Sequence, residues 1–286
     1  MSIQVRNLSH IYNRGLSTET VALDNINFEI YDGEVVGVVG HTGSGKSTLL
    51  QHLNGLLKPS EGQIIVGGTD ITKPGVAMRD IRKRVGLVFQ YPEYQLFEET
   101  VAKDVAFGPR NLGLREDEIQ QRVRDALELV GLDYEHLKDR SPFELSGGQK
   151  RRVAIAGVIA MKPQVLILDE PTAGLDPGSH REIMKMIQDV HQFEHNIIIF
   201  VSHNMADVAA LADKVLVMDR GKLVMADTPR GVFRQRNRLA EISLDVPPIT
   251  ELMYRLRENG AEVSLDVLSL REGEQAIYDY LRGAGR

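Results

Sequence analysis

Residues 40–47 read GHTGSGKS, which fits the phosphate-binding pattern G-x-x-x-x-G-K-[ST]. The apolar run EVVGVVG (34–40) leads into this stretch, and the helix-forming run STLLQHLNGLL (47–57) follows it. Glycines let backbone N–H groups turn towards phosphate oxygens, and a helix N-terminus adds partial positive charge. The strand–loop–helix context therefore predicts a P-loop that binds ATP, in preference to a glycine-rich turn that binds nothing.

Nine consecutive residues are the candidate nucleotide contacts of this loop. Lys46 is expected to neutralise the β and γ phosphates, the Ser47 hydroxyl to ligate Mg²⁺, and Thr48 to reach the α phosphate. The complete set is Gly40, His41, Thr42, Gly43, Ser44, Gly45, Lys46, Ser47 and Thr48.

Two more apolar runs resemble the one before the P-loop. They are QVLILDE (164–170) and NIIIFVSH (196–203), and both are rich in Val, Ile and Leu without polar alternation. Strands buried on both faces of a parallel sheet have this composition. Because each run leads towards a helical segment, the sequence predicts a layered α/β core.

Two adjacent carboxylates follow the second of these runs. A carboxylate at the tip of a buried strand is costly unless it is paired or binds a metal, so Asp169 is expected to hold Mg²⁺ directly or through water. Strand side chains alternate in direction, so Glu170 is expected to point elsewhere and to act on the attacking water as general base, or to orient it. The alternative is that Glu170 is an ordinary surface carboxylate.

The remaining segments suggest how the chain is divided. The runs IQVRNL (3–8), ALDNINFEI (22–30) and QIIVGG (63–68) read as antiparallel strands, and residues 214–227 read as a hairpin around Arg220-Gly221. Residues 95–162 are predicted to form a helical subdomain, with one apolar helical face and Gly131 as a C-cap. The main domain is expected to span 1–227, followed by a helical tail, 228–286, that Pro247-Pro248 interrupts. The apolar face comprises Ile119, Val123, Ala126, Leu127 and Val130.

Composition limits the class of protein. The chain has 286 residues, a formal net charge of -6 and no cysteine, which excludes disulfides and thiolate metal sites and gives no global indication of nucleic-acid binding. The basic Arg82–Arg84 is read as a solvated loop or a strand edge. The first ten residues show no signal-peptide pattern, and no run approaches the roughly 18 apolar residues of a membrane span. If the protein acts at a membrane, another chain is expected to span it.

The stretch LSGGQ (145–149) also precedes a helix-forming run, QKRRVAIAGVIAM (149–161). Alone it would be read as a flexible turn. However, the P-loop, Gln90, LSGGQ, LILDEP (166–171), AGLD (173–176) and His203 occur in that order. Together they closely resemble the nucleotide-binding domain of ATP-binding cassette (ABC) ATPases over about residues 3–226. The resemblance implies a mixed core sheet, an antiparallel β subdomain and a helical subdomain.

The resemblance also implies roles for residues outside the P-loop. Two such domains pair head to tail, so Ser146, Gly147, Gly148 and Gln149 would complete a nucleotide site on a partner. Gln90 would sense Mg²⁺ and the attacking water, Asp176 would cross the dimer interface, and His203 would contact the γ phosphate. Tyr12 would stack on adenine, although an ordinary edge-strand tyrosine is the alternative.

Two longer segments, 89–114 and 144–177, closely resemble ATPases of energy-coupling factor (ECF) transporters, which import vitamins and transition-metal ions. YPEYQLF (91–97) looks like the second ATPase type of a heterodimeric pair. The resemblance implies a different ATPase as partner, a transmembrane coupling protein, a separate substrate-binding membrane protein, and a place at the cytoplasmic face of the membrane. The coupling protein is expected to dock in an apolar groove, or else the aromatic residues there pack inside the helical subdomain. The docking residues are Gln90, Tyr91, Tyr94, Leu96 and Phe97.

Other classes of function remain as alternatives. The chain could be the homodimeric ATPase of an ordinary importer or of a cobalt or nickel ECF importer. A soluble ABC ATPase of translation or DNA repair is disfavoured, because the chain has one cassette and no long coiled-coil insertion. A nucleotide-binding module without catalysis conflicts with the intact Lys46, Asp169, Glu170 and His203.

Overall fold

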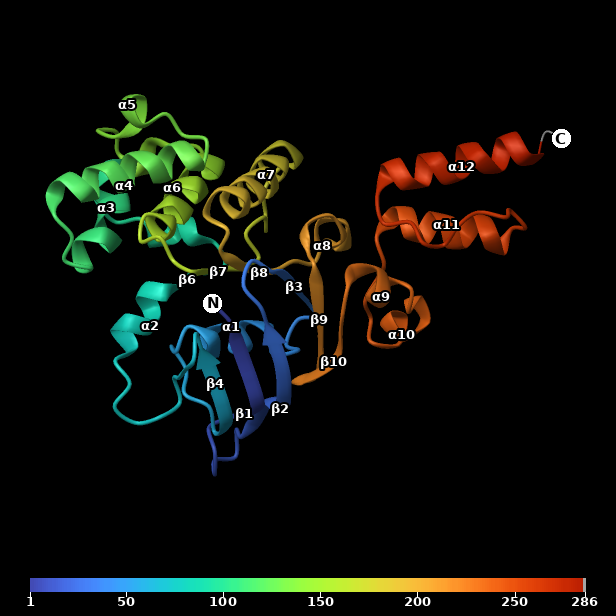
Figure 1. Cartoon of the computed structure of the whole chain (residues 1–286), viewed down its shortest axis with the longest axis horizontal. Coiled ribbons are helices and arrows are strands. Elements are labelled where there is room, and N and C mark those ends of the chain that lie inside the picture. Colours follow the sequence, from blue (N-terminus) through green and yellow to red (C-terminus); the bar gives the residue numbers. More distant parts are fainter. Residues whose placement is uncertain (285–286) are drawn as a thin grey trace.

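Five parallel strands and one antiparallel edge strand form the central sheet of the protein (Figure 1). The structure is a computed structural model that describes residues 1–284. The three apolar runs of the sequence form three adjacent strands, β3, β8 and β7, so the predicted α/β core is confirmed. The order across the sheet is β10 (Lys222–Asp227), β9 (Lys214–Asp219), β3 (Val35–Val39), β8 (Ile197–Val201), β7 (Val165–Asp169) and β6 (Val85–Val88).

Both faces of this sheet are buried, each against a different layer. Alternate side chains of β3, such as Val36 and Val38, pack with α1 (Lys46–Leu53) and the antiparallel strands. The others, Val35 and Val39, join the core made with the helices on the opposite face. Because neither face meets water, an uninterrupted apolar strand is the stable choice.

A second sheet is antiparallel and lies beside α1. Its order is β2 (Thr20–Ile30), β1 (Ile3–Tyr12), β4 (Glu61–Val66) and β5 (Thr69–Asp70). The hairpin predicted between β9 and β10 is also present. Its two turn residues, Arg220 and Gly221, have φ values of 45° and 77°, and positive φ at both central positions matches the right-handed twist of the flanking strands.

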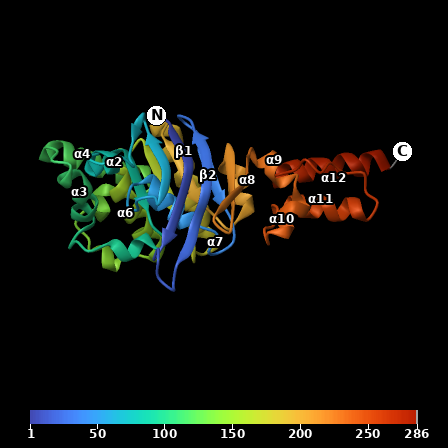
Figure 2. The same ribbon diagram turned by 90° about the horizontal axis from the view of Figure 1, so that it is seen from below.

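Helices fill the region between Gln90 and β7 and form one end of the elongated molecule (Figure 2). The predicted apolar face lies in and just after α4, and all five of its residues are buried. Gly131 follows the end of α4 with a left-handed φ of 71°. The limits 95 and 162 stay a prediction. The elements are η1 (Pro92–Gln95), α3 (Val101–Asn111), α4 (Glu116–Leu129), α5 (Tyr134–Leu137), η2 (Pro142–Glu144) and α6 (Gly147–Ile159).

One local interpretation of the sequence was wrong. Arg82–Arg84 form the last turn of a helix, α2 (Met78–Arg84), rather than a loop or strand edge. Basic side chains at that position interact favourably with the negative end of the helix dipole. Two further helices, α7 (Pro177–Glu194) and α8 (Met205–Leu211), follow β7 and β8. Within residues 1–284, no helix combines the length and apolarity that a membrane span requires.

The tail contains two pairs of helices with different packing. Val232 and Phe233, from α9 (Pro229–Phe233), and Leu239, from α10 (Arg236–Glu241), belong to the core of the main domain. The pair α11 (Pro248–Glu258) and α12 (Leu270–Ala284) has a small core of its own, made of Ile249, Met253, Val263 and Val267. We call this pair the tail lobe. The division at residue 227 stays a prediction, and the packing shows that a separate core begins only near Ile249.

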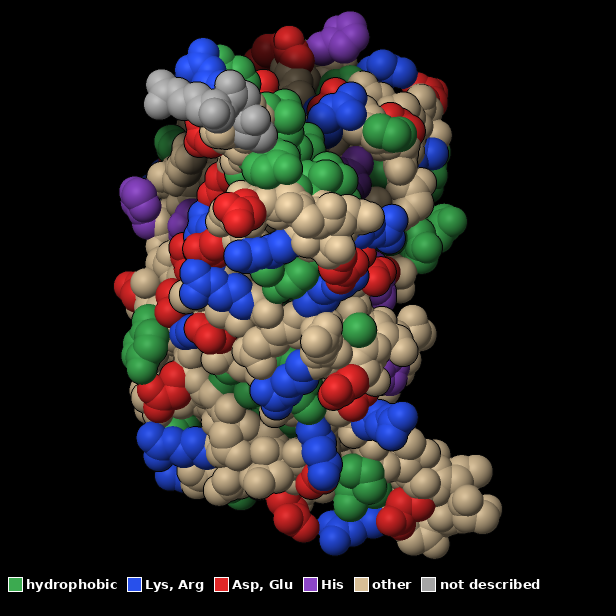
Figure 3. Space-filling view, turned by 90° about the vertical axis from the view of Figure 1, so that its right-hand side faces the viewer, with side chains coloured by type: hydrophobic (Ala, Val, Ile, Leu, Met, Phe, Trp, Pro, Cys, Tyr) green, Lys and Arg blue, Asp and Glu red, His purple; other side chains and the backbone are tan. Residues whose placement is uncertain are grey.

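The tail lobe forms the end of the molecule opposite to the helical region (Figure 2). Tyr278 and Leu281, in the second half of α12, are 48% and 62% exposed. Figure 3 views this end and shows hydrophobic side chains gathered beside the C-terminal end. The lobe therefore presents apolar as well as charged groups to the outside.

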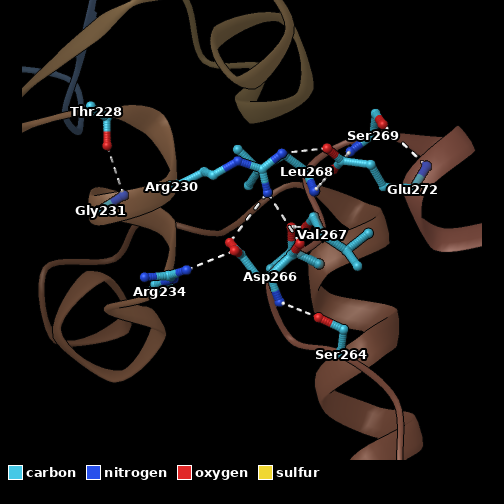
Figure 4. Close-up of polar contacts among 11 residues, drawn as sticks. Thr228, Arg230, Gly231, Arg234, Ser264, Asp266, Val267, Leu268, Ser269 and Glu272 are labelled. Atoms are coloured by element: carbon cyan, nitrogen blue, oxygen red, sulfur yellow. Dashed lines mark hydrogen bonds and ion pairs between the residues drawn. The ribbon is translucent and has the colours of Figure 1, made fainter. Parts of the chain in front are cut away.

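Arginines of α9 and the adjoining turn hold the tail lobe through polar contacts (Figure 4). Arg230 donates to the Asp266 carbonyl and carboxylate at 3.1 and 3.2 Å, and it also pairs with Glu272. Arg234 donates to Asp266 Oδ2 at 2.6 Å. These partly exposed pairs add little free energy of folding, so their main effect is to fix where the lobe attaches.

Candidate nucleotide-binding and catalytic site

The predicted catalytic residues meet at one edge of the central sheet. The P-loop follows β3, Ser202 and His203 follow β8, Asp169 ends β7, and Gln90 follows β6. These strands are parallel neighbours in the order β3, β8, β7, β6. Their carboxyl ends therefore lie side by side, which is where ligands bind in parallel α/β sheets.

Two of the three glycines of the P-loop lie where a side chain would not fit. Gly45 precedes α1 with a φ of 101°, and a Cβ there would lie 2.6 Å from the Ala22 carbonyl oxygen. A Cβ on Gly40 would collide with the Met218 carbonyl and lie 2.5 Å from Ser44 Oγ. By contrast, Gly43 has a φ of 81° and open space around it. The backbone of the loop is thus packed against its surroundings, with Gly43 on the open side.

Lys46 is held inside this loop. Its ammonium donates to the carbonyl oxygens of Gly40 and His41 at 2.7 and 3.0 Å, and the residue is 6% exposed. Burial lowers the pKa of Lys46, while the nearby carboxylates of Glu170 and Asp169 oppose that change. A cation desolvated in this way interacts strongly with a polyphosphate.

The β9–β10 hairpin supports the P-loop from outside. His41 Nε2 lies 2.9 Å from Asp219 Oδ1. The Gly221 N–H donates to the Ser44 carbonyl at 3.0 Å, and the Gly221 carbonyl accepts from the Asp24 N–H at 2.8 Å. The turn therefore joins the loop to both sheets, a contact between segments that are far apart in the sequence.

The residues predicted to hold Mg²⁺ offer a suitable set of oxygen donors. Burial raises the pKa of Asp169, and a hydrogen bond from Ser47 opposes that rise. Asp169 is 7% exposed as a residue, so a bound cation would offset the desolvation of its carboxylate. Carboxylate and hydroxyl oxygens suit Mg²⁺, so Ser47 and Asp169 fit the ion.

Glu170 lies between Gln90 and His203. Its Oε2 accepts a hydrogen bond from Gln90 Nε2 at 2.9 Å, and its Oε1 lies 2.8 Å from His203 Nε2. The structure brings these three predicted residues together from the ends of β6, β7 and β8. The arrangement leaves one carboxylate fixed at both oxygens beside the P-loop lysine.

The direction of the Glu170 side chain has a different cause from the alternation along a strand that the sequence suggested. Strand β7 ends at Asp169, and Glu170 has a left-handed φ of 50°. The side chain is therefore turned by the backbone after the strand, and alternation within the strand does not apply to it. Left-handed backbone in a non-glycine residue is uncommon and clusters at functional sites.

Tyr12 lies at the end of β1, close to the helix that follows the P-loop. Its hydroxyl is 3.3 Å from Thr48 Oγ1, and the ring meets that of His10 edge-on with centroids 4.5 Å apart. The residue is 36% exposed. The residue is thus partly exposed next to Thr48, and adenine stacking stays a prediction.

The LSGGQ segment is ordered by its own hydrogen bonds. Ser146 caps α6, its Oγ accepts from the Gln149 N–H at 3.3 Å, and Gln149 Oε1 accepts from the Ser146 N–H at 3.1 Å. A Cβ on Gly147 would have no atom within 4 Å, whereas one on Gly148 would lie 3.1 Å from Ser179 Oγ. Among residues 1–284, no hydrogen bond or ion pair joins these four residues to the P-loop.

Asp176 caps α7 beside that segment. Its carboxylate accepts from the N–H groups of Gly178 and Ser179 and from Ser179 Oγ, at 2.8, 3.1 and 2.6 Å. These hydrogen bonds, the one from Ser179 Oγ foremost, lower the pKa of Asp176. Since Ser179 lies close to Gly148, Asp176 and the LSGGQ segment are near one another.

The predicted docking residues divide into two groups. Leu96 and Phe97 line a groove of about 740 Å³ between α2, α3 and α6. Gln90, Tyr91 and Tyr94 lie outside it, and Tyr94 is 84% exposed. The groove therefore has fewer of the predicted aromatic residues than expected, and its other walls include Phe107, Met161, Arg79, Arg82 and Lys83.

Sequence reasoning missed Arg151 and Glu93. Arg151 is 1% exposed and forms a two-pronged ion pair with Glu93, at 3.0 Å through Nε and 2.7 Å through Nη2. One feature of the sequence could have indicated it, because Arg151 falls on the buried stripe of α6 with Ile155 and Ile159. An arginine at such spacing requires a buried partner.

Comparison with known protein families agrees with the fold. A family model described as ABC transporter matches residues 23–173. The CbiO1 protein of Clostridium perfringens, described as part of the ABC transporter complex CbiONQ, is 43% identical with a TM-score of 0.74. That alignment covers 88% of this chain and 98% of the other. The ABC transporter cassette MJ0796 is 29% identical with a TM-score of 0.70, over 80% and 99% of the two chains.

Two relatives match the whole length of the chain. A protein of Caldanaerobacter subterraneus subsp. tengcongensis is 60% identical over 99% of both chains. One of Clostridioides difficile is 58% identical over 100% of this chain and 99% of its own. Both are named energy-coupling factor transporter ATP-binding protein EcfA2, which confirms the expected resemblance to the second ATPase type. The chain therefore belongs to the ABC transporter family, as one of the ATP-hydrolysing subunits of energy-coupling factor transporters.

Proposed function

We propose that this ATPase uses Glu170 as the general base for hydrolysis and thereby drives uptake of a vitamin or related micronutrient. The observation that supports this assignment most strongly is the fixed position of Glu170 between Gln90 and His203. Each neighbour contacts one carboxylate oxygen, and the remaining lone pairs are free to accept a proton from water. A group held in this way needs little reorganisation before the reaction.

In the proposed reaction, Glu170 takes a proton from water as the water oxygen bonds to the γ phosphorus. The bond to the oxygen that bridges the β and γ phosphates breaks, and ADP leaves. Lys46 and the P-loop N–H groups bind the phosphates, and His203 and Gln90 hold Glu170 and contact the γ phosphate and the water. Mg²⁺, bound by Ser47 and Asp169 with Gln90 nearby, would neutralise phosphate charge.

The LSGGQ segment acts on a second nucleotide in this proposal. Ser146, Gly147, Gly148 and Gln149 would contact ATP held by a different ATPase subunit, and Asp176 would cross the same interface. Two observations support this role: the open space at Gly147 and the absence, within the described chain, of hydrogen bonds from the segment to its own P-loop. The names of the relatives favour a heterodimer with another ATPase of the same transporter class.

The membrane partners are a transmembrane coupling protein and, through it, a substrate-binding membrane protein. Leu96 and Phe97, which line the partly apolar groove, lie six and seven residues after Gln90, so a helix seated there would move when Gln90 moves. Tyr91 and Tyr94 would contact the same partner outside the groove. In this proposal the subunit works at the cytoplasmic face of the cell membrane.

Purification of the complex in mild detergent, followed by mass spectrometry, tests these partners. We expect a second ATPase, one coupling membrane protein and several small membrane proteins to elute with this chain. Copies of this chain alone with a permease pair would instead indicate an ordinary homodimeric importer. Ribosomal or repair proteins without any membrane protein would exclude the transport function.

A further inference from the structure

Arg151 joins three segments that the reaction requires. It lies in the second turn of α6, the helix that begins with the LSGGQ glycines. Its Nε and Nη2 donate to both oxygens of Glu93, three residues after Gln90. Its Nη1 donates to the carbonyl oxygens of Pro171 and Ala173, at 3.2 and 2.7 Å, directly after Glu170.

The geometry of this contact restrains the backbone as well as the side chains. Arg151 contacts the chain within three residues after Gln90, at Glu93, and within three residues after Glu170, at Pro171 and Ala173. Glu170 itself has a left-handed φ of 50°. Tyr91 is also left-handed, with a φ of 56°, and its ring centroid lies 5.7 Å from the guanidinium carbon. Uncommon backbone conformations persist only where the surroundings enforce them.

The charge of Arg151 is balanced locally. The guanidinium is buried and Glu93 is 17% exposed, so the pair is mostly shielded from solvent. Burial would raise the pKa of Glu93, but the hydrogen bonds and charge of Arg151 hold it below its ordinary value. A planar guanidinium can bond a carboxylate with two parallel donors and still reach two carbonyls, which a lysine ammonium cannot do.

We infer that Arg151 is a positioning residue for hydrolysis. It fixes the LSGGQ helix, Gln90 and Glu170 relative to one another. The LSGGQ segment, which contacts ATP on the partner, therefore moves together with Gln90 and Glu170, which act on ATP in this chain's own P-loop. The hydrogen bonds of Arg151 go to Glu93, Pro171 and Ala173, and none goes to residues 40–48 of the P-loop. The inference rests on the proposed function of Glu170 and of the LSGGQ segment.

The test is Arg151→Lys in the purified transporter complex, with ATP affinity and turnover measured separately. We expect kcat to fall at least about tenfold, while the Kd of a fluorescent ATP analogue at this chain's P-loop stays within about twofold, because Arg151 has no contact with the P-loop. Glu93→Gln is a milder second variant, and we expect it to lower kcat less and to leave the same Kd unchanged.

Arg122→Lys is the matched control. Arg122 also pairs with a glutamate, Glu118, and donates to two carbonyls, those of Ala160 and Met161, but it holds neither Gln90 nor Glu170. We expect its kcat to equal that of the unmodified complex. If Arg122→Lys lost as much turnover as Arg151→Lys, or if Arg151→Lys lowered only thermal stability and kept kcat, the positioning role would be wrong.

The same experiment separates the inference from the function on which it rests. Gly147→Asp and Glu170→Gln are measured alongside. If both abolish turnover and Arg151→Lys does not, only the inference fails. If neither affects turnover, the proposed roles of the LSGGQ segment and of Glu170 are wrong, and the inference about Arg151 is wrong with them.

Discussion

Gln90 and Glu170 are 80 residues apart in the sequence, yet Gln90 Nε2 donates to Glu170 Oε2 at 2.9 Å. The contact joins the ends of β6 and β7, two parallel neighbours in the central sheet. Gln90 is also the last residue before the segment that leads to the helical region. This hydrogen bond therefore links Glu170 to the helical region, in addition to the contacts that Arg151 of α6 makes with the carbonyls of Pro171 and Ala173.

Glu170→Gln is expected to retain ATP binding and to lose most hydrolysis, by roughly 100-fold or more. The amide has the shape of the carboxylate but cannot accept a proton from water. Steady-state phosphate release together with ATP-analogue binding checks this prediction. Turnover at the unmodified rate would exclude Glu170 as the general base.

Substitution of two P-loop glycines separates backbone strain from steric collision. Gly43→Ala is expected to lower the free energy of unfolding by about 1–2 kcal/mol, the cost of left-handed backbone for a residue with a Cβ. Gly45→Ala should cost more, because its Cβ would also lie 2.6 Å from the Ala22 carbonyl oxygen. Urea unfolding of the two variants measures the difference, and equal values would contradict the close packing described for Gly45.

The Arg151–Glu93 pair predicts a dependence of stability on pH. The pKa of Glu93 is lowered in the folded protein, so ionised Glu93 stabilises the fold above its ordinary pKa, and this contribution is lost as pH falls through the lowered value. Glu93→Gln should therefore cost about 3 kcal/mol at pH 7. The difference in free energy of unfolding between this variant and the unmodified chain should become smaller below about pH 4.3.

Urea unfolding at a series of pH values measures this cost. Glu118→Gln, which breaks a more exposed pair with Arg122, serves as the control and should cost no more than about 1 kcal/mol. A cost for Glu93→Gln that stays constant from pH 7 to pH 3 would show that ionisation of Glu93 does not contribute.

The sequence predicted the elements that depend on local pattern. The unbroken apolar runs around Val36, Leu166 and Ile198 form adjacent buried strands. Their composition indicated this, because a strand that is covered on both faces has apolar side chains on both and shows no polar alternation. The motifs at the ends of these strands came together for the same reason, since parallel strands share an edge. Arg220-Gly221 indicated a hairpin because few residue pairs adopt two consecutive left-handed conformations.

Features that depend on long-range packing could not be predicted in this way. The partners of Arg151 lie 20 to 58 residues away in the sequence, and no local pattern specifies them. The left-handed φ of Glu170 is likewise imposed by its surroundings and not by its residue type. The packing of Val232 and Phe233 into the main core also depends on contacts across the fold, whereas composition alone indicated a change of character near Thr228.

Gly147→Asp tests most directly the central claim that the P-loop and the LSGGQ segment of one chain serve different nucleotides. A Cβ at Gly147 would have no atom within 4 Å, so the new carboxylate should leave the chain's own fold intact and repel the phosphates of ATP on the partner. We predict that turnover of the complex is lost while ATP binding to this chain's own P-loop is unchanged. Loss of binding at that P-loop would contradict the account.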